Sequence, residues 1–78
     1  MNKVFKDMTV TANAIENLLD EYADHKATKK AYEKDGDWES EEYMYHRGFC
    51  EAAERWIRCC GISPDSPIVD KLVMEHME

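Results

Sequence analysis

Two histidines and two cysteines, residue types that bind zinc, raise the question of a zinc site. His46 and Cys50 lie four residues apart, and Cys60 follows further along the same segment. If that segment is a helix, all three share one side of it, and His25 is the nearest source of a fourth ligand. Structural zinc sites usually take close ligand pairs from two segments, and the chain has no CxxC motif. We therefore expect no metal site, and Cys50 and Cys60 are interpreted as small buried hydrophobes.

Catalysis and cofactor binding are disfavoured as well. A nucleophilic cysteine needs a base within hydrogen-bond reach and an oxyanion hole, and no motif supplies them. A chain of 78 residues also buries too little surface to enclose a deep pocket. Tyr43 and Tyr45 beside His46 hint at acid–base work, but aromatic residues at helical spacing usually pack in a core. The chain is predicted to be neither an enzyme nor a cofactor carrier.

The most unusual feature is an acidic stretch around Trp38, with six carboxylates and one lysine in ten residues. Such a run is often only a solvated turn. The alternative is a protein-binding edge, where carboxylates meet an Arg/Lys-rich surface and the tryptophan gives a desolvated contact. This charge density also imitates a phosphate backbone at a nucleic-acid channel. The candidate partner-binding residues are Glu33, Asp35, Asp37, Trp38, Glu39, Glu41 and Glu42.

Charge and apolar runs limit the other partners. Lys26, Lys29, Lys30 and Lys34 form a basic patch with His25, but the formal net charge of −7 gives an overall field that repels DNA. No apolar run reaches the ~18–20 residues of a membrane span, and no signal peptide is recognisable. An odd number of cysteines fits a reducing compartment. We expect no direct nucleic-acid binding, no membrane contact and a cytoplasmic location.

Three predicted helices position these residues. The first covers 11–34: Thr11 is its expected N-cap, Val10 and Ile15 its hydrophobic staple, and the apolar stripe ends near Tyr22. Residues 35–37 break it at a glycine. Residues 1–10 fit either a helical turn or a short strand.

The second predicted helix covers 38–60 and is strongly amphipathic. Either Asp37 or Ser40 caps its start, and Gly61 ends it. Glu51 with Arg55, and Glu54 with Arg58, have the i,i+4 spacing of ion pairs. Its apolar face is expected to consist of Trp38, Tyr45, Phe49, Ala52, Ala53, Trp56 and Cys60.

The third predicted helix covers 66–77 and starts at Ser66-Pro67. The fold class is therefore all-α: an antiparallel helical hairpin with a short third C-terminal helix, in a single domain over residues 1–78. Trp56→Ala is expected to cost about 3–5 kcal/mol. The expected core is Ile15, Leu19, Tyr22, Tyr45, Phe49, Ala53, Trp56, Leu72 and Val73.

Apolar surface beside these stripes favours self-association as a homodimer. Three helices with few large aliphatic residues leave apolar side chains without cover. The residues expected to stay exposed are Leu18, Tyr43, Met44 and Ile57.

The segment from Glu41-Glu42-Tyr43 through Gly48, Ala52-Ala53 and Trp56 resembles the second helix of many small proteins encoded by phages and mobile elements of Gram-positive bacteria. In size, acidity and helical-hairpin character the chain also resembles phage anti-defence proteins, including anti-CRISPR proteins. That resemblance implies a non-catalytic inhibitor or adaptor in a bacterial host cell, which blocks a basic nucleic-acid-binding surface of a host nuclease complex. The alternative is a self-associating structural or regulatory protein of a phage or mobile element.

Overall fold

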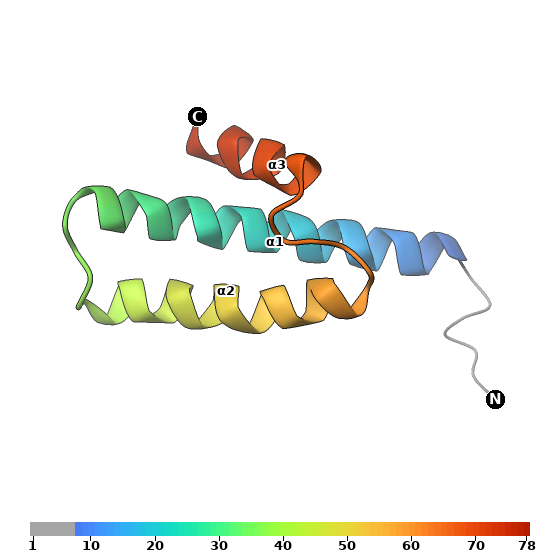
Figure 1. Cartoon of the computed structure of the whole chain (residues 1–78), viewed down its shortest axis with the longest axis horizontal. Helices are drawn as coiled ribbons and strands as arrows, with labels where there is room; N and C mark the ends of the chain where they lie inside the picture. The colour runs from blue at the N-terminus through green and yellow to red at the C-terminus, as the bar shows by residue number, and fades with distance from the viewer. Residues whose placement is uncertain (1–7) are drawn as a thin grey trace.

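The other two helices both pack against one long central helix. The computed structural model describes residues 8–78 and contains α1 (Met8–Lys34), α2 (Glu41–Cys59) and α3 (Pro67–Met77), with no strand in that range. α2 runs antiparallel along one side of α1, and α3 packs on the other side (Figure 1). α2 and α3 do not contact each other within residues 8–78. The predicted all-α fold with a helical hairpin and a short third helix is confirmed.

The start of α1 differs from the prediction. The helix already includes Met8, so Thr11 lies inside it and is not its N-cap. Of the ambiguous residues 1–10, the last three are helical, and residues 1–7 lie outside the described part of the chain. The lysine-rich half of α1 is also less solvated than expected, because Ala23 and Ala27 are buried there.

Two glycines end the long helices in the same way. Gly36 and Gly61 both have φ of 80°, a conformation that costs glycine little. After each, the next amide reaches back to a carbonyl five residues earlier: Asp37 to Tyr32 at 2.9 Å, and Ile62 to Ile57 at 3.2 Å. These bonds satisfy carbonyls that the helix end leaves free. Both predicted helix ends are therefore supported by local hydrogen bonding.

α2 starts three residues later than predicted, at Glu41. Asp37 Oδ1 accepts hydrogen bonds from the amides of Glu39 and Ser40, at 3.3 and 3.0 Å, and so folds 37–40 into a turn. Ser40 Oγ then accepts from the amide of Tyr43 at 3.1 Å, which makes Ser40 the N-cap. Trp38 consequently lies in the turn and not on the apolar face of a helix.

α3 begins as the sequence predicts. Ser66 Oγ accepts from the amide of Val69, and Pro67 occupies the first turn, where a missing amide costs nothing. In the connector, Pro64 is buried and Asp65 lies 4.0 Å from Lys26 Nζ. His76 near the end of α3 is hydrogen-bonded to Asp20 at 2.8 Å, so both ends of α3 are tied to α1.

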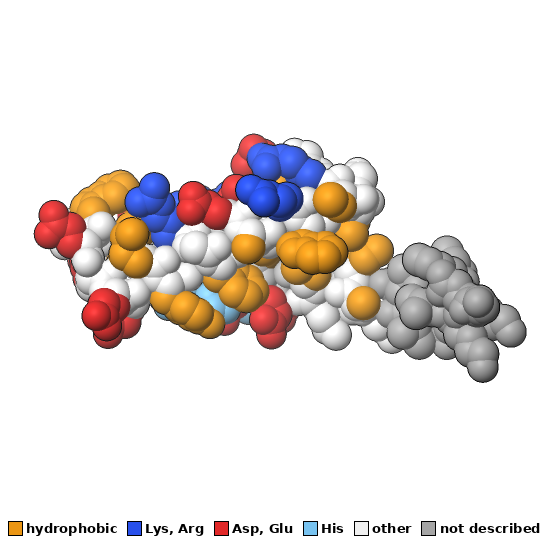
Figure 2. Space-filling view, turned by 90° about the horizontal axis from the view of Figure 1, so that it is seen from below, with side chains coloured by type: hydrophobic (Ala, Val, Ile, Leu, Met, Phe, Trp, Pro, Cys, Tyr) orange, Lys and Arg blue, Asp and Glu red, His pale blue; other side chains and the backbone are white. Residues whose placement is uncertain are grey.

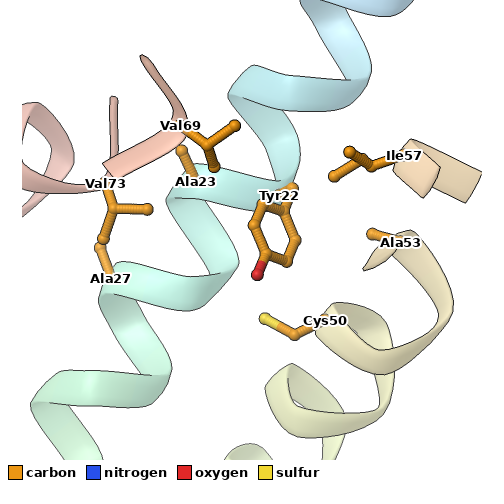
Figure 3. Close-up of a cluster of buried hydrophobic side chains, with 8 residues drawn as sticks. All are labelled: Tyr22, Ala23, Ala27, Cys50, Ala53, Ile57, Val69 and Val73. Atoms are coloured by element: carbon orange, nitrogen blue, oxygen red, sulfur yellow. The ribbon is translucent and has the colours of Figure 1, made fainter. Parts of the chain in front are cut away.

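The core consists of two contacts on opposite sides of α1. Tyr22 faces α2, whereas Ala23 and Ala27 face two valines of α3 (Figure 3). Alanines on α1 let α3 approach closely. The buried cluster is Tyr22, Ala23, Ala27, Cys50, Ala53, Ile57, Val69 and Val73.

The predicted core is right in part. Tyr22, Ala53 and Val73 are buried, and Leu19, Phe49 and Leu72 are partly buried against the cluster. Ile15 is half-buried and lies outside the cluster. Tyr45 and Trp56 were placed wrongly: they are 61% and 67% exposed.

The reason is that α2 is rotated about its axis relative to the prediction. It buries Tyr43 and Ile57, which were predicted to stay exposed, together with Cys50 and Ala53, whose predicted burial is right. Tyr43 and Ile57 therefore cannot supply the self-association surface assigned to them, whereas Met44 is exposed and Leu18 is half-buried.

Candidate functional site

The acidic residues gather at the turn between α1 and α2, at one end of the hairpin. In Figure 2 acidic side chains stand out at the left end of the molecule, where this turn lies. Trp38 is 57% exposed among them. The structure divides the seven predicted partner-binding residues into two groups: two that the fold itself uses and five that remain exposed.

Glu33 belongs to the first group. Its carboxylate accepts a hydrogen bond from the Tyr43 hydroxyl at 2.8 Å and lies 3.3 Å from Lys29 Nζ. Partial burial opposes ionisation, but the bonds from Tyr43 and Lys29 prevail and lower the pKa of Glu33. The same contact, together with burial, raises the pKa of Tyr43. Glu33 thus joins α1 to α2 and is not free for a partner.

Asp37 also serves the fold. The hydrogen bonds that it accepts from Ser40 and Glu39 lower its pKa, since they favour the charged carboxylate. These bonds shape the turn that presents Trp38. We define the acidic tip as the five remaining exposed residues: Asp35, Trp38, Glu39, Glu41 and Glu42.

Trp38 is supported from behind. Its ring lies 5.8 Å, centroid to centroid, from the ring of buried Tyr43. Tyr43 is in turn held by Glu33 on α1. More than half of the Trp38 side chain remains exposed, so the tip offers an apolar surface among carboxylates.

Two histidines and an aromatic ring lie together between α1 and α2. This contact was not predicted from the sequence. His25 Nδ1 and His46 Nδ1 are 2.8 Å apart, and His25 stacks on Phe49 with ring centroids 3.8 Å apart. Burial and the neighbouring His25 lower the pKa of His46, against the opposing charge of Asp24. The signal was available: 25 and 46 are on facing helices of an antiparallel hairpin whose turn lies near residue 37.

The thiols do not join these histidines in a metal site. Cys50 is buried, which raises its pKa to about 11 and disfavours the thiolate that metals and nucleophilic chemistry require. Cys60 is exposed beyond the end of α2, so its predicted burial was wrong. Within residues 8–78, no three His, Cys, Asp or Glu side chains form a group able to hold a metal ion.

The basic patch on α1 is partly used by the fold. Lys26 lies over the ring of Tyr22, with Nζ 5.5 Å from the centroid, and Lys29 pairs with Glu33. Lys30 and Lys34 remain exposed. Two of the four lysines of this patch therefore make contacts within the fold.

The ion pairs expected along α2 are absent from the described part of the chain. Glu54 instead accepts a hydrogen bond from the Tyr22 hydroxyl at 2.9 Å, and burial together with this bond raises the pKa of Tyr22. Arg55 and Arg58 are exposed, and neither forms a salt bridge within residues 8–78. Their charges are available to another molecule.

Comparisons with known proteins do not add a family to this description. No protein-family model matches the chain, and searches of curated proteins and of solved structures gave no match. Among the described helices, none combines the length and apolarity that crossing a membrane requires.

Proposed function

We propose that this protein acts by stoichiometric binding, without catalysis, and that the acidic tip contacts a basic surface on a partner protein. The observation that carries the proposal is Trp38, 57% exposed beside four exposed carboxylates whose side chains form no hydrogen bond or ion pair within residues 8–78. A large exposed aromatic ring within a charged rim is the composition of a binding hot spot.

The chemistry of the tip points to a surface that normally meets phosphates. Nucleic-acid channels are lined with Lys and Arg, which attract negative charge through long-range fields. Four carboxylates around an indole offer that field together with a ring that can lie on an arginine side chain or an apolar wall. A protein bound in this way blocks nucleic acid from its partner. The resemblance to phage anti-defence proteins makes host nuclease complexes the first partners to test.

The test compares two variants with the same change in charge. In the tip variant, the exposed tip carboxylates become amides: Asp35→Asn, Glu39→Gln, Glu41→Gln and Glu42→Gln. In the control variant, four exposed carboxylates elsewhere are changed: Glu16→Gln, Glu21→Gln, Asp70→Asn and Glu75→Gln. Asp37 is left intact because it holds the turn.

The tagged natural protein should capture from bacterial lysate a partner that the tip variant and Trp38→Ala lose and the control variant keeps. The complex should weaken as ionic strength rises, and it should compete with a single-stranded oligonucleotide for the partner. Equal capture by the tip and control variants, or a partner whose nucleic-acid binding is unaffected, would contradict the proposal.

A further inference from the structure

Three side-chain hydrogen bonds join α1 to α2 in the described part of the chain, and the middle one links two histidines. The outer two each run from a tyrosine hydroxyl to a glutamate carboxylate. Between them, His25 Nδ1 on α1 lies 2.8 Å from His46 Nδ1 on α2. Histidine is the side chain whose charge ordinarily changes near neutral pH. The middle bond is therefore the one of the three that responds to mild acid.

The two imidazole rings point their Nδ1 atoms at each other. Their centroids are 5.0 Å apart, which is close to the largest separation that rings with nitrogens 2.8 Å apart can have. One of these nitrogens must therefore donate a proton to the bond, and the other must accept it. The contact between the helices thus requires that one Nδ1 remains unprotonated.

The pair can take up one proton without losing this bond. A neutral histidine carries its proton on one ring nitrogen and a lone pair on the other, so the donor ring keeps a lone pair on Nε2. Protonation there leaves an imidazolium that donates to a neutral ring, and such charge-assisted bonds are the stronger ones. A second proton finds only the accepting Nδ1, where it sets two N–H groups head to head.

We propose that the contact between His25 and His46 is an acid-sensitive switch in the hairpin, which stays closed when it binds one proton and opens when it binds the second. Two imidazolium rings cannot keep their nitrogens 2.8 Å apart, because their charges repel and both nitrogens carry hydrogens. The outer two bonds between the helices contain no histidine and persist. The opening is therefore confined to the middle of the hairpin, and it does not depend on the acidic tip having a partner.

The rings around the pair show what the opening uncovers. His25 stacks on Phe49 with centroids 3.8 Å apart and lies edge to face with Tyr45 at 5.5 Å. His46 lies 5.2 Å from the ring of Tyr45 and 6.1 Å from the ring of Tyr32. Separation of the histidines removes the cover from Phe49, beside Tyr45, which is already exposed. Mild acid thus enlarges an aromatic surface on α2.

The charged groups around the pair leave the second proton unfavourable. Asp24 of α1 favours a charged His46, but its carboxylate also lies 3.7 Å from His76 Nδ1 on α3. Burial and the neighbouring His25 outweigh Asp24 and lower the pKa of His46. Two further carboxylates within one helical turn are exposed, where water and salt screen their charges. Apart from the tyrosines of the outer two bonds, the other titratable groups in ring contact with either histidine, or one turn from it, are Glu21, Lys29, Tyr32, Glu42, Tyr45 and Cys50.

The experiment is an NMR titration of the full chain from pH 8 to pH 4.5 that follows the ring protons of its three histidines. The rings of His25 and His46 should titrate together in two steps, separated by more than about one pH unit, and His76 in a single step. Through the second step, the nuclear Overhauser contact between His25 and Phe49 should be lost while far-ultraviolet circular dichroism stays constant. Independent single steps for His25 and His46, or a contact with Phe49 that survives both protons, would overturn the proposal.

Two histidine variants give the matched comparison. In His25→Asn, an amide that can donate or accept takes the place of Nδ1, so His46 can be protonated without a second positive charge opposite it. Its titration should become a single step with a midpoint at higher pH. His76→Asn, which changes the histidine of α3, should leave the two steps unchanged. The same titration of His46 in the natural chain and in His25→Asn, or loss of the two steps in His76→Asn, would contradict the proposal. If His25→Asn does not fold, the titration of the natural chain decides alone.

Discussion

The two apolar faces of α2 invert the usual relation between side chain size and burial. The face against α1 buries two large residues, Tyr43 and Ile57, together with small Cys50 and Ala53. The face turned to solvent holds Tyr45 and Trp56, which are larger on average. A ranking by hydrophobicity alone therefore selects the wrong face of this helix.

The difference shows what lets two long helices pack. Small residues allow close approach, and polar residues are accepted at the contact when a partner on the facing helix satisfies them. Glu54 accepts a hydrogen bond from the hydroxyl of Tyr22, and His46 is hydrogen-bonded to His25. Two polar side chains of α2, Glu54 and His46, are therefore part of its contact with α1.

The largest expected effect tests which face is the core. Ile57→Ala should destabilise the protein by about 2–5 kcal/mol, because it opens a cavity beside a fully buried position. Trp56→Ala should cost the dilute monomer less than about 1 kcal/mol, since two-thirds of the ring is already in water. This replaces the cost of about 3–5 kcal/mol expected from the sequence. Urea denaturation at low concentration measures both, and a larger loss for Trp56→Ala would reverse the assignment of faces.

The second effect concerns the buried thiol at high pH. Burial raises the pKa of Cys50 from 9.0 to about 11, so its contribution to stability is present below pH 9 and is lost as pH rises from 9 to 11. A shift of this size corresponds to at most about 3 kcal/mol. The free energy of unfolding should fall over this range, and less steeply in Cys50→Ala.

Exposed Cys59 provides the matched control for that titration. Cys59→Ala should keep the full alkaline slope. Part of the slope should survive in Cys50→Ala, because the pKa values of Tyr22 and Tyr43 are also raised by burial and by their carboxylate partners. Identical slopes in the natural protein and Cys50→Ala would show that this thiol does not face the contact.

The smallest effect is expected from the histidine pair in mild acid. The pKa of His46 is lowered in the folded chain, so the stability associated with its neutral form is present above its ordinary pKa of 6.5 and is lost as pH falls through the folded value. Unfolding free energies measured between pH 7.5 and 5 should decline, and the decline should be shallower in His46→Gln. Glu33 and Asp37, whose pKa values are lowered, begin to contribute only near pH 5, at the lower end of this range. A steeper decline in His46→Gln would contradict the prediction.

The sequence predicts the fold well because its signals are local. Gly36, Gly61 and the Ser66-Pro67 pair act through hydrogen bonds and backbone angles within a few residues, and each lies where the helices end or begin. The rotation of α2 could not be predicted in the same way. It depends on the hydrogen bonds of His46 and Glu54 with α1, which join residues 21 and 32 positions apart.

In the candidate site, too, local features were predictable and contacts between distant residues were not. Composition located the acidic stretch around Trp38, but it did not distinguish the carboxylates that serve the fold. Glu33 is engaged by Tyr43 because the hairpin closes there, and Asp37 by its own turn. Only the geometry of the turn reduces the predicted seven residues to the five of the acidic tip.

Because α1 alone separates α2 from α3, the two outer helices can detach independently. α3 is the shorter, and its release exposes two valines and two alanines while the hairpin keeps Tyr22, Ile57 and the contacts near the turn. In hydrogen exchange, the amides of α3 should therefore exchange through a partial opening of lower free energy than those in the middle of α1 and α2. Folding should proceed in the matching order, with the sequence-local hairpin formed first and the C-terminal helix docking last.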